Sequence, residues 1–217
     1  MSNLRILSYT TDLNNQNFKL LQNKLDVEIL PILQNWSWDF YPKSVSVYET
    51  IKNFNSEDIV LVCDAYDVLP KNKLTKNILF DRINKKFNLN KITFNAEKNC
   101  YPDTSLINLY PHSDSPWKYL NAGIYVGKVN KVLVMLENLL PKIKNSMDQR
   151  EFSISFINNE FDITLDYNCD VFQTMYMLND DDLFINDNII LNRKTNTEPL
   201  LFHGNGKSNL SIIKNFL

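Results

Sequence analysis

Short apolar runs and amphipathic segments alternate along this chain. The runs typical of strands are 4–9, 27–31, 58–64, 91–97, 121–129, 163–167 and 199–206. The segments with apolar residues at helical spacing are 14–25, 43–54, 131–144 and 148–159. Strands that alternate with helices predict an α/β fold with a mostly parallel central sheet flanked by helices. Because no internal repeat or long linker interrupts the pattern, we predict one domain over residues 1–217.

The predicted central strand ends in two carboxylates. The chain reads IVLVCDAYDVL from 59 to 69, so Asp64 ends the apolar run and Asp67 follows three residues later. Sheets of this kind bind ligands outside the carboxyl ends of their strands. Two carboxylates at one strand end repel each other, and a bound cation relieves that repulsion. Oxygen ligands suit magnesium or manganese.

A histidine near the other end of the chain supplies a third candidate ligand. His203 ends a predicted strand, and Gly204, Asn205 and Gly206 follow it. One imidazole beside two carboxylates favours manganese. Glycines let backbone N–H groups approach a phosphate closely, and Lys207 adds a positive charge. Together with the two aspartates, these residues predict a metal-bound diphosphate site.

Two other kinds of site share part of this pattern. Phosphatases of the haloacid dehalogenase type also end their first strand in paired aspartates, but these lie two residues apart, whereas Asp64 and Asp67 lie three apart. His112, Asp114 and His203 fit the two-histidine, one-carboxylate iron site of oxygenases. Such oxygenases use a barrel of short antiparallel strands and commonly carry an arginine after the distal histidine. The helix-rich pattern opposes that barrel, and no arginine follows His203.

Composition narrows the class of protein. The chain is 44% hydrophobic, 12% aromatic and 22% charged, with a net charge of −2 and scattered lysines, so neither nucleic acid nor an anionic membrane is an expected partner. Cys63, Cys100 and Cys169 form no C-x-x-C pair, which predicts reduced thiols. No apolar run approaches the ~20 residues of a membrane span. No signal peptide is visible either, so we expect a cytosol-like compartment unless a targeting segment is missing.

Eight segments, in order along nearly the whole chain, resemble the glycosyltransferase domain of the procollagen lysyl hydroxylases. They are SYTTD, NW at 35–36, DAYDVL, FNAEKNCYP, YLNAGIYVG, DQREF, LDYNCDVFQ and FHGNGKS. DAYDVL resembles the D-x-x-D metal motif of that family, and FHGNGKS resembles the segment with the third metal ligand and the diphosphate contacts. One such segment could arise by chance, whereas eight in order are a specific signal.

The resemblance implies a GT-A-type, Rossmann-like fold and a manganese-dependent transferase. The donor would be a UDP-sugar, with glucose ahead of galactose, and the acceptor hydroxylysine or galactosyl-hydroxylysine in collagen-like sequence. The implied roles are metal binding by Asp64, Asp67 and His203, uridine binding by Thr10, Trp36 and Tyr66, diphosphate binding by Asn205, Gly206 and Lys207, and catalysis or sugar contacts by Glu97, Asn121, Asp148 and Gln149, supported by Asp166 and Gln173.

The chemistry of sugar transfer agrees with these roles. Negative charge grows on the departing diphosphate, where a metal and Lys207 would stabilise it. Positive charge grows on the sugar ring, which a carboxylate such as Asp148 or Glu97 can offset.

The chain also departs from the family pattern. Met147 precedes a single Asp148 where the family often has a run of acids, and Tyr101 stands where the family has tryptophan. Ala122 and Ile124 replace serine and glycine of the Leu-Asn-Ser-Gly-Gly motif. The second hypothesis is therefore a non-catalytic nucleotide-sugar binder that retains the metal site. The oligomeric state is not determined by the sequence, which is compatible with a homodimer.

Overall fold

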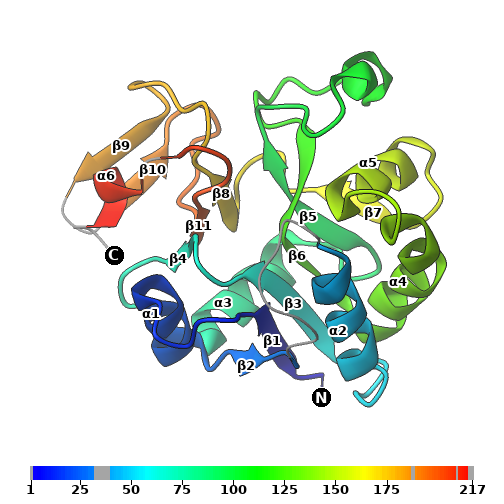
Figure 1. The fold of residues 1–217 in the computed structure, drawn as a ribbon. Coiled ribbons are helices and arrows are strands. Elements are labelled where there is room, and N and C mark those ends of the chain that lie inside the picture. The colour runs from blue at the N-terminus through cyan, green and yellow to red at the C-terminus, as the bar shows by residue number, and fades with distance from the viewer. Residues whose placement is uncertain (1, 32–39, 187–188, 209, 215–217) are drawn as a thin grey trace.

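The computed structural model describes residues 2–31, 40–186, 189–208 and 210–214. Its largest sheet has six strands in the order β2-β1-β3-β6-β5-β7 (Figure 1). Their bounds are Leu4–Tyr9 for β1, Glu28–Ile29 for β2, Ile59–Asp64 for β3, Ile92–Glu97 for β5, Tyr119–Lys128 for β6 and Ile163–Leu165 for β7. All of these strands except β6 run in the same direction, so the predicted mostly parallel sheet is confirmed.

Helices cover both faces of this sheet (Figure 1). One face carries α2 (Tyr41–Ile51), α4 (Val129–Ile143) and α5 (Asp148–Ile157), and the other carries α1 (Gln16–Leu25) and α3 (Lys76–Lys86). Alternation along β3 explains the two layers, because successive side chains of a strand point to opposite faces. Val60 and Val62 pack in the core under α2, α4 and α5, whereas Leu61 and Cys63 pack with α1 and α3.

The reversed strand β6 brings two parts of the site together. Residues 98–118, which include the 3₁₀ helix η1 (Thr104–Leu109), connect β5 to β6 without a crossover helix, as an antiparallel pair allows. Glu97 at the end of β5 therefore lies opposite Tyr119 at the start of β6. Asn121 follows two residues later on the same strand.

A smaller sheet carries the other half of the site. It consists of β4 (Val68–Pro70), β11 (Leu201–His203) and β8 (Phe172–Thr174), in the order β4-β11-β8. His203 pairs with Val68, which directly follows Asp67. A hairpin of β9 (Leu183–Asn186) and β10 (Ile189–Asn192) and the short helix α6 (Ser211–Lys214) lie next to this sheet in Figure 1. The pairing of β11 with β4 therefore places the predicted histidine beside the predicted aspartates.

The helices α2 and α5 both begin next to the predicted site. Helix α2 has Pro42 in its first turn, where the missing backbone N–H leaves no helical hydrogen bond unmade. Helix α5 begins with Asp148, whose negative charge is favourable at a helix N-terminus. Lys43 and Asp148 thus enter the site from the first turns of two different helices.

Several helices and strands of the structure were not predicted from the sequence. No element was expected over 68–90 or 172–192, where the structure has β4, α3, β8, β9 and β10. Three-residue strands such as β4 and β8 are too short to show an alternating pattern, and only Leu79 and Ile83 of α3 are buried. Within the described ranges, no helix is long and apolar enough to cross a membrane.

Candidate functional site

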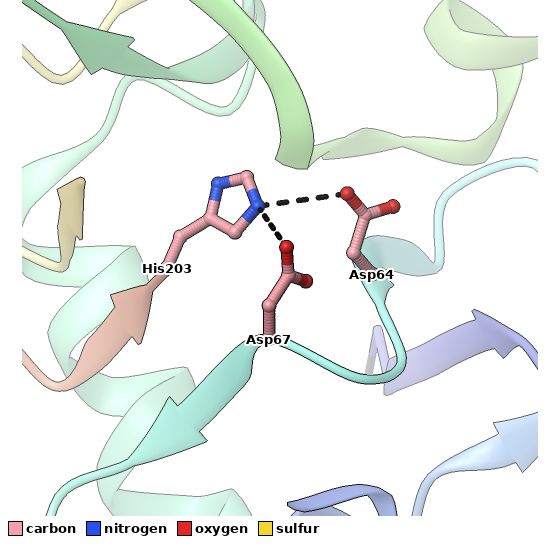
Figure 2. Close-up of side chains that lie close together, drawn as sticks. All are labelled: Asp64, Asp67 and His203. Atoms are coloured by element: carbon pink, nitrogen blue, oxygen red, sulfur yellow. Dashed lines mark ion pairs between the residues drawn. The ribbon is translucent and has the colours of Figure 1, made fainter. Parts of the chain in front are cut away.

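Three residues from three elements converge at the centre of the site. Asp64 ends β3, Asp67 precedes β4 and His203 ends β11, and their side chains point toward one another (Figure 2). The Nε2 atom of His203 lies 3.5 Å from a carboxylate oxygen of Asp64 and 3.4 Å from one of Asp67. One potential ligand atom from each of the three residues lies within 4.8 Å of the other two. Bonds of about 2.0–2.2 Å from nitrogen and oxygen to one divalent ion fit this spacing, so the residues suit such a cation.

The charges of these groups depend on one another. Burial by itself lowers the pKa of His203, but the carboxylates of Asp67 and Asp64 outweigh it and raise that pKa to about 10. Burial raises the pKa of Asp64, whereas Lys43 and His203 lower it to about 2. The carboxylate of Asp64 therefore stays ionised at neutral pH, and positive charge gathers around it.

Lys43 is a member of the site that the sequence analysis missed. Its ammonium group lies 2.9 Å from Asp64 and 3.7 Å from Asp148, and the residue is 8% exposed. Burial lowers the pKa of Lys43, but the two carboxylates raise it above its ordinary value. The sequence contains a signal for this residue, because Lys43 shares helical spacing with Val47 and Ile51 and so lies on the apolar face of the predicted helix. All three residues are buried in the structure.

Asp148 is a buried carboxylate and the second acidic partner of Lys43, after Asp64. One oxygen accepts a 2.7 Å hydrogen bond from the backbone N–H of Gln149. The other oxygen makes no hydrogen bond among the described residues. Burial raises the pKa of Asp148 above its ordinary value, although Lys43 lowers it. This second oxygen faces the ammonium group of Lys43 at 3.7 Å, and Asp148 is among the residues that line the cavity.

Glu97 is the centre of a buried network of amides. One carboxylate oxygen accepts hydrogen bonds from Asn121 (3.1 Å) and Gln149 (2.8 Å), and the other accepts one from Asn205 (2.8 Å). Burial raises the pKa of Glu97 to about 7, although these amides lower it. The network joins the end of β5, the first residues of β6, the start of α5 and the segment after β11.

Tyr66 links the aspartate motif to the loop after β1. Its hydroxyl oxygen accepts the backbone N–H groups of Thr11 (2.7 Å) and Asp12 (2.8 Å) and lies 3.1 Å from the hydroxyl of Thr10. Burial raises the pKa of Tyr66, but the hydrogen bonds from Thr10 and Thr11 lower it below its ordinary value. The loop therefore holds the phenol ring by its hydroxyl end.

The segment after His203 forms the predicted glycine turn. Gly206 has a φ of 62°, in the left-handed region that glycine favours, and Lys207 is exposed. The side chain of Asn205 is already occupied, because its oxygen accepts the N–H groups of Met175 and Tyr176 while its amide donates to Glu97. Asn205 thus holds the turn through contacts within the protein.

These groups line one cavity of about 560 Å³, within the usual range for ligand sites. Most of the predicted site residues lie on its wall, namely Asp64, Tyr66, Asp67, Glu97, Asn121, Asp148, Gln149, His203, Asn205, Gly206 and Lys207. Thr10 is fully buried behind Tyr66. Trp36 lies outside the described residues.

Two predicted supporting residues have roles within the fold. Asp166 accepts backbone N–H groups of residues 170, 171 and 172, and Gln173 hydrogen-bonds with Asn192 and the carbonyl of Thr174. Both side chains are buried. They stabilise the chain around β8, next to β11.

The oxygenase alternative is wrong. The side chains of His112 and Asp114 are 89% and 101% exposed. The one group of three or more metal-ligating side chains found in the described part of the chain contains His203 but neither of these residues. The layered α/β fold also differs from the antiparallel barrel that such a site requires.

Comparisons with known proteins agree with the layered fold. A crystal structure of a glycosyltransferase involved in the glycosylation of the major capsid of PBCV-1 superposes with a TM-score of 0.60 over 95% of this chain and 94% of that one. At 11% identity, this likeness shows the fold alone.

Relatives in sequence include viral and animal proteins. Uncharacterized protein R699 of Acanthamoeba polyphaga mimivirus is 36% identical over 160 residues, which are 72% of this chain and 33% of that protein. The procollagen-lysine,2-oxoglutarate 5-dioxygenase of Drosophila melanogaster is 32% identical over 168 residues, 72% of this chain and 22% of that protein. This chain therefore spans a third or less of these relatives.

A family model described as the PLOD GT domain matches residues 45–217, which include both metal-motif aspartates and His203. The match covers most of the chain, and it agrees with the animal relatives and with the shared glycosyltransferase fold. The chain therefore belongs to the PLOD GT domain family of glycosyltransferases.

Proposed function

We propose that this protein transfers a hexose from a UDP-sugar, and that it needs a divalent cation, with manganese the expected ion. The observation that carries the proposal is that ligand atoms of Asp64, Asp67 and His203 lie within 4.8 Å of one another on the wall of the cavity. The cation would supply positive charge for the departing diphosphate. The mixed set of two carboxylates and one imidazole favours manganese over magnesium.

The nucleotide would bind along the loop after β1. The face of the Tyr66 ring would stack on the uracil, because its hydroxyl edge is already held by residues 10–12. Thr10 would act through Tyr66, and Trp36 remains a candidate for the same base. Gly206 and Lys207 would contact the diphosphate, where the lysine offsets its charge.

The sugar would lie between the diphosphate and α5. Asp148, which lines the cavity and has one oxygen without a hydrogen bond, is the proposed catalytic carboxylate that faces positive charge on the sugar ring. Both carboxylate oxygens of Glu97 already accept hydrogen bonds from the amides of Asn121, Gln149 and Asn205. We therefore assign Glu97 to positioning. Asn121 and Gln149, whose amides hold Glu97, also line the cavity, and we propose that they face the sugar or acceptor.

The acceptor is proposed from the relatives' names, and the donor sugar from the resemblance of the sequence motifs to the family. Animal relatives are named for procollagen lysine, and one of them, from Caenorhabditis elegans, is called a multifunctional procollagen lysine hydroxylase and glycosyltransferase. Hydroxylysine or galactosyl-hydroxylysine in a collagen-like chain is the corresponding acceptor, and glucose is the preferred sugar over galactose.

The test measures UDP release from UDP-glucose and UDP-galactose with a hydroxylysine-containing collagen peptide, with and without manganese. Release that requires both the metal and the peptide supports the proposal. Binding of donor without release identifies a non-catalytic nucleotide-sugar binder instead. Asp67→Ala is expected to abolish manganese-dependent UDP binding, because it removes one of the proposed metal ligands. The fold should persist, because the substitution also removes the repulsion between two neighbouring carboxylates on the cavity wall.

A further inference from the structure

Gly123 lies in the middle of β6, directly against the imidazole ring of His203. A Cβ atom built at position 123 would lie 2.0 Å from Cε1, 2.6 Å from Nε2 and 2.7 Å from Nδ1 of that ring. Carbon atoms in contact are separated by about 3.5–4.0 Å, so any side chain here would overlap the ring. Among the described glycines only Gly206 has a positive φ, so the backbone of Gly123 is not in the left-handed region. The ring, and not the backbone conformation, therefore requires a glycine.

The ring of His203 has little freedom to move away. Its side chain is 4% exposed, and both chain segments that meet at the contact are anchored. The N–H of Gly123 donates a 3.0 Å hydrogen bond to the side chain of Asn121, which in turn donates to Glu97. Asn205, two residues after His203, donates to the other oxygen of Glu97. One carboxylate thus fixes both sides of the contact.

From these contacts we infer that Gly123 is a positioning residue of the metal centre. The bare α-carbon lets the imidazole lie where Nε2 is 3.5 Å from Asp64 and 3.4 Å from Asp67. A methyl group at this position displaces the ring and separates the nitrogen ligand from the two oxygen ligands. The inference rests on the proposed function, because it assigns a role toward the proposed cation.

The first experiment compares manganese affinity, with and without UDP, in the wild type, Gly123→Ala and Gly127→Ala, using calorimetry and the electron paramagnetic resonance of free manganese. Gly127 lies on the same strand, and its added Cβ would meet Ile92 and Val132 instead of His203. We expect Gly123→Ala to weaken binding by about 10- to 100-fold, the loss typical of residues that orient a metal ligand. Gly127→Ala is expected to retain the wild-type affinity. Wild-type affinity in Gly123→Ala overturns the inference.

The second experiment is a double-mutant cycle in metal-free protein, read by denaturant unfolding. Gly123→Ala is expected to destabilise the wild type but to cost much less in the His203→Ala variant, because the methyl group then occupies the space left by the ring. Equal destabilisation in both backgrounds overturns the inference. If Gly123→Ala alone does not fold, recovery of folding in the double variant supports it and continued failure overturns it. Failure of the wild type to bind manganese would instead count against the proposed function. The result of the metal-free cycle does not depend on that function.

Discussion

Lys43 donates a 2.9 Å hydrogen bond to one carboxylate oxygen of Asp64, while the other oxygen of Asp64 faces His203. Asp64 therefore stands between a permanent positive charge and the proposed metal position. A ligand held in this way has one oxygen oriented by the protein and the other directed to the cation. Lys43 also lies 3.7 Å from Asp148, so one lysine connects the metal centre with the proposed catalytic carboxylate.

Replacement of Lys43 tests this link. Lys43→Met leaves the buried Asp148 and the half-buried Asp64 without their shared cation, so we expect the unfolding free energy of the metal-free protein to fall by about 3 kcal/mol. Denaturant unfolding measures the loss. Lys52→Met, at the exposed end of the same helix, is the matched control and should have a much smaller effect. Similar stabilities for the two variants would contradict the role of Lys43.

The buried carboxyl of Glu97 predicts a pH dependence. Its pKa in the folded protein is about 7, above its ordinary value of 4.5, because burial disfavours the charged form. A raised pKa stabilises the fold below pH 4.5, and this contribution is lost as the pH rises through 7. The wild type should therefore lose up to about 3 kcal/mol relative to Glu97→Gln between pH 5 and pH 8.

Unfolding of both proteins in a chelator at several pH values measures this difference. Contributions from other carboxyls, such as Asp166, occur in both proteins and cancel in the comparison. A stability difference that stays constant from pH 5 to pH 8 would show that Glu97 does not titrate in this range.

Asp148 should separate catalysis from binding. Asp148→Asn keeps the size of the side chain but removes the charge that faces the sugar, so turnover is expected to fall by about 10²–10⁴-fold. UDP affinity measured with manganese should change little, because Asp148 is not among the proposed metal ligands. Turnover at the wild-type rate would exclude Asp148 as the catalytic carboxylate.

Tyr66→Phe tests how the nucleotide platform is held. The ring for stacking remains, but the backbone N–H groups of Thr11 and Asp12 lose the hydroxyl that accepts them. We expect UDP affinity to weaken by about 0.5–1.5 kcal/mol, the range for a lost hydrogen bond. Tyr66→Ala should weaken it further because stacking is also lost. Equal affinities for Tyr66→Phe and the wild type would show that the loop does not depend on the hydroxyl.

The alternation of apolar runs and amphipathic segments determined much of the fold. The predicted strands at 4–9 and 58–64 match β1 and β3, and the helix predicted over 131–144 matches α4 within two residues. Such patterns are local, because burial of one face imposes a period on consecutive residues. The pair Asp64 and Asp67 was visible for the same reason, since both lie in one short motif.

Tertiary structure decided what the pattern could not. The ladder between β11 and β4 places His203 beside Asp67, and the fold of α2 turns Lys43 into the site. The ring on Gly123 and the three amides on Glu97 likewise come from segments far apart in the chain. Hydrogen bonds and close packing between remote segments leave no period in the sequence, so the contacts among these residues became visible only in the folded chain.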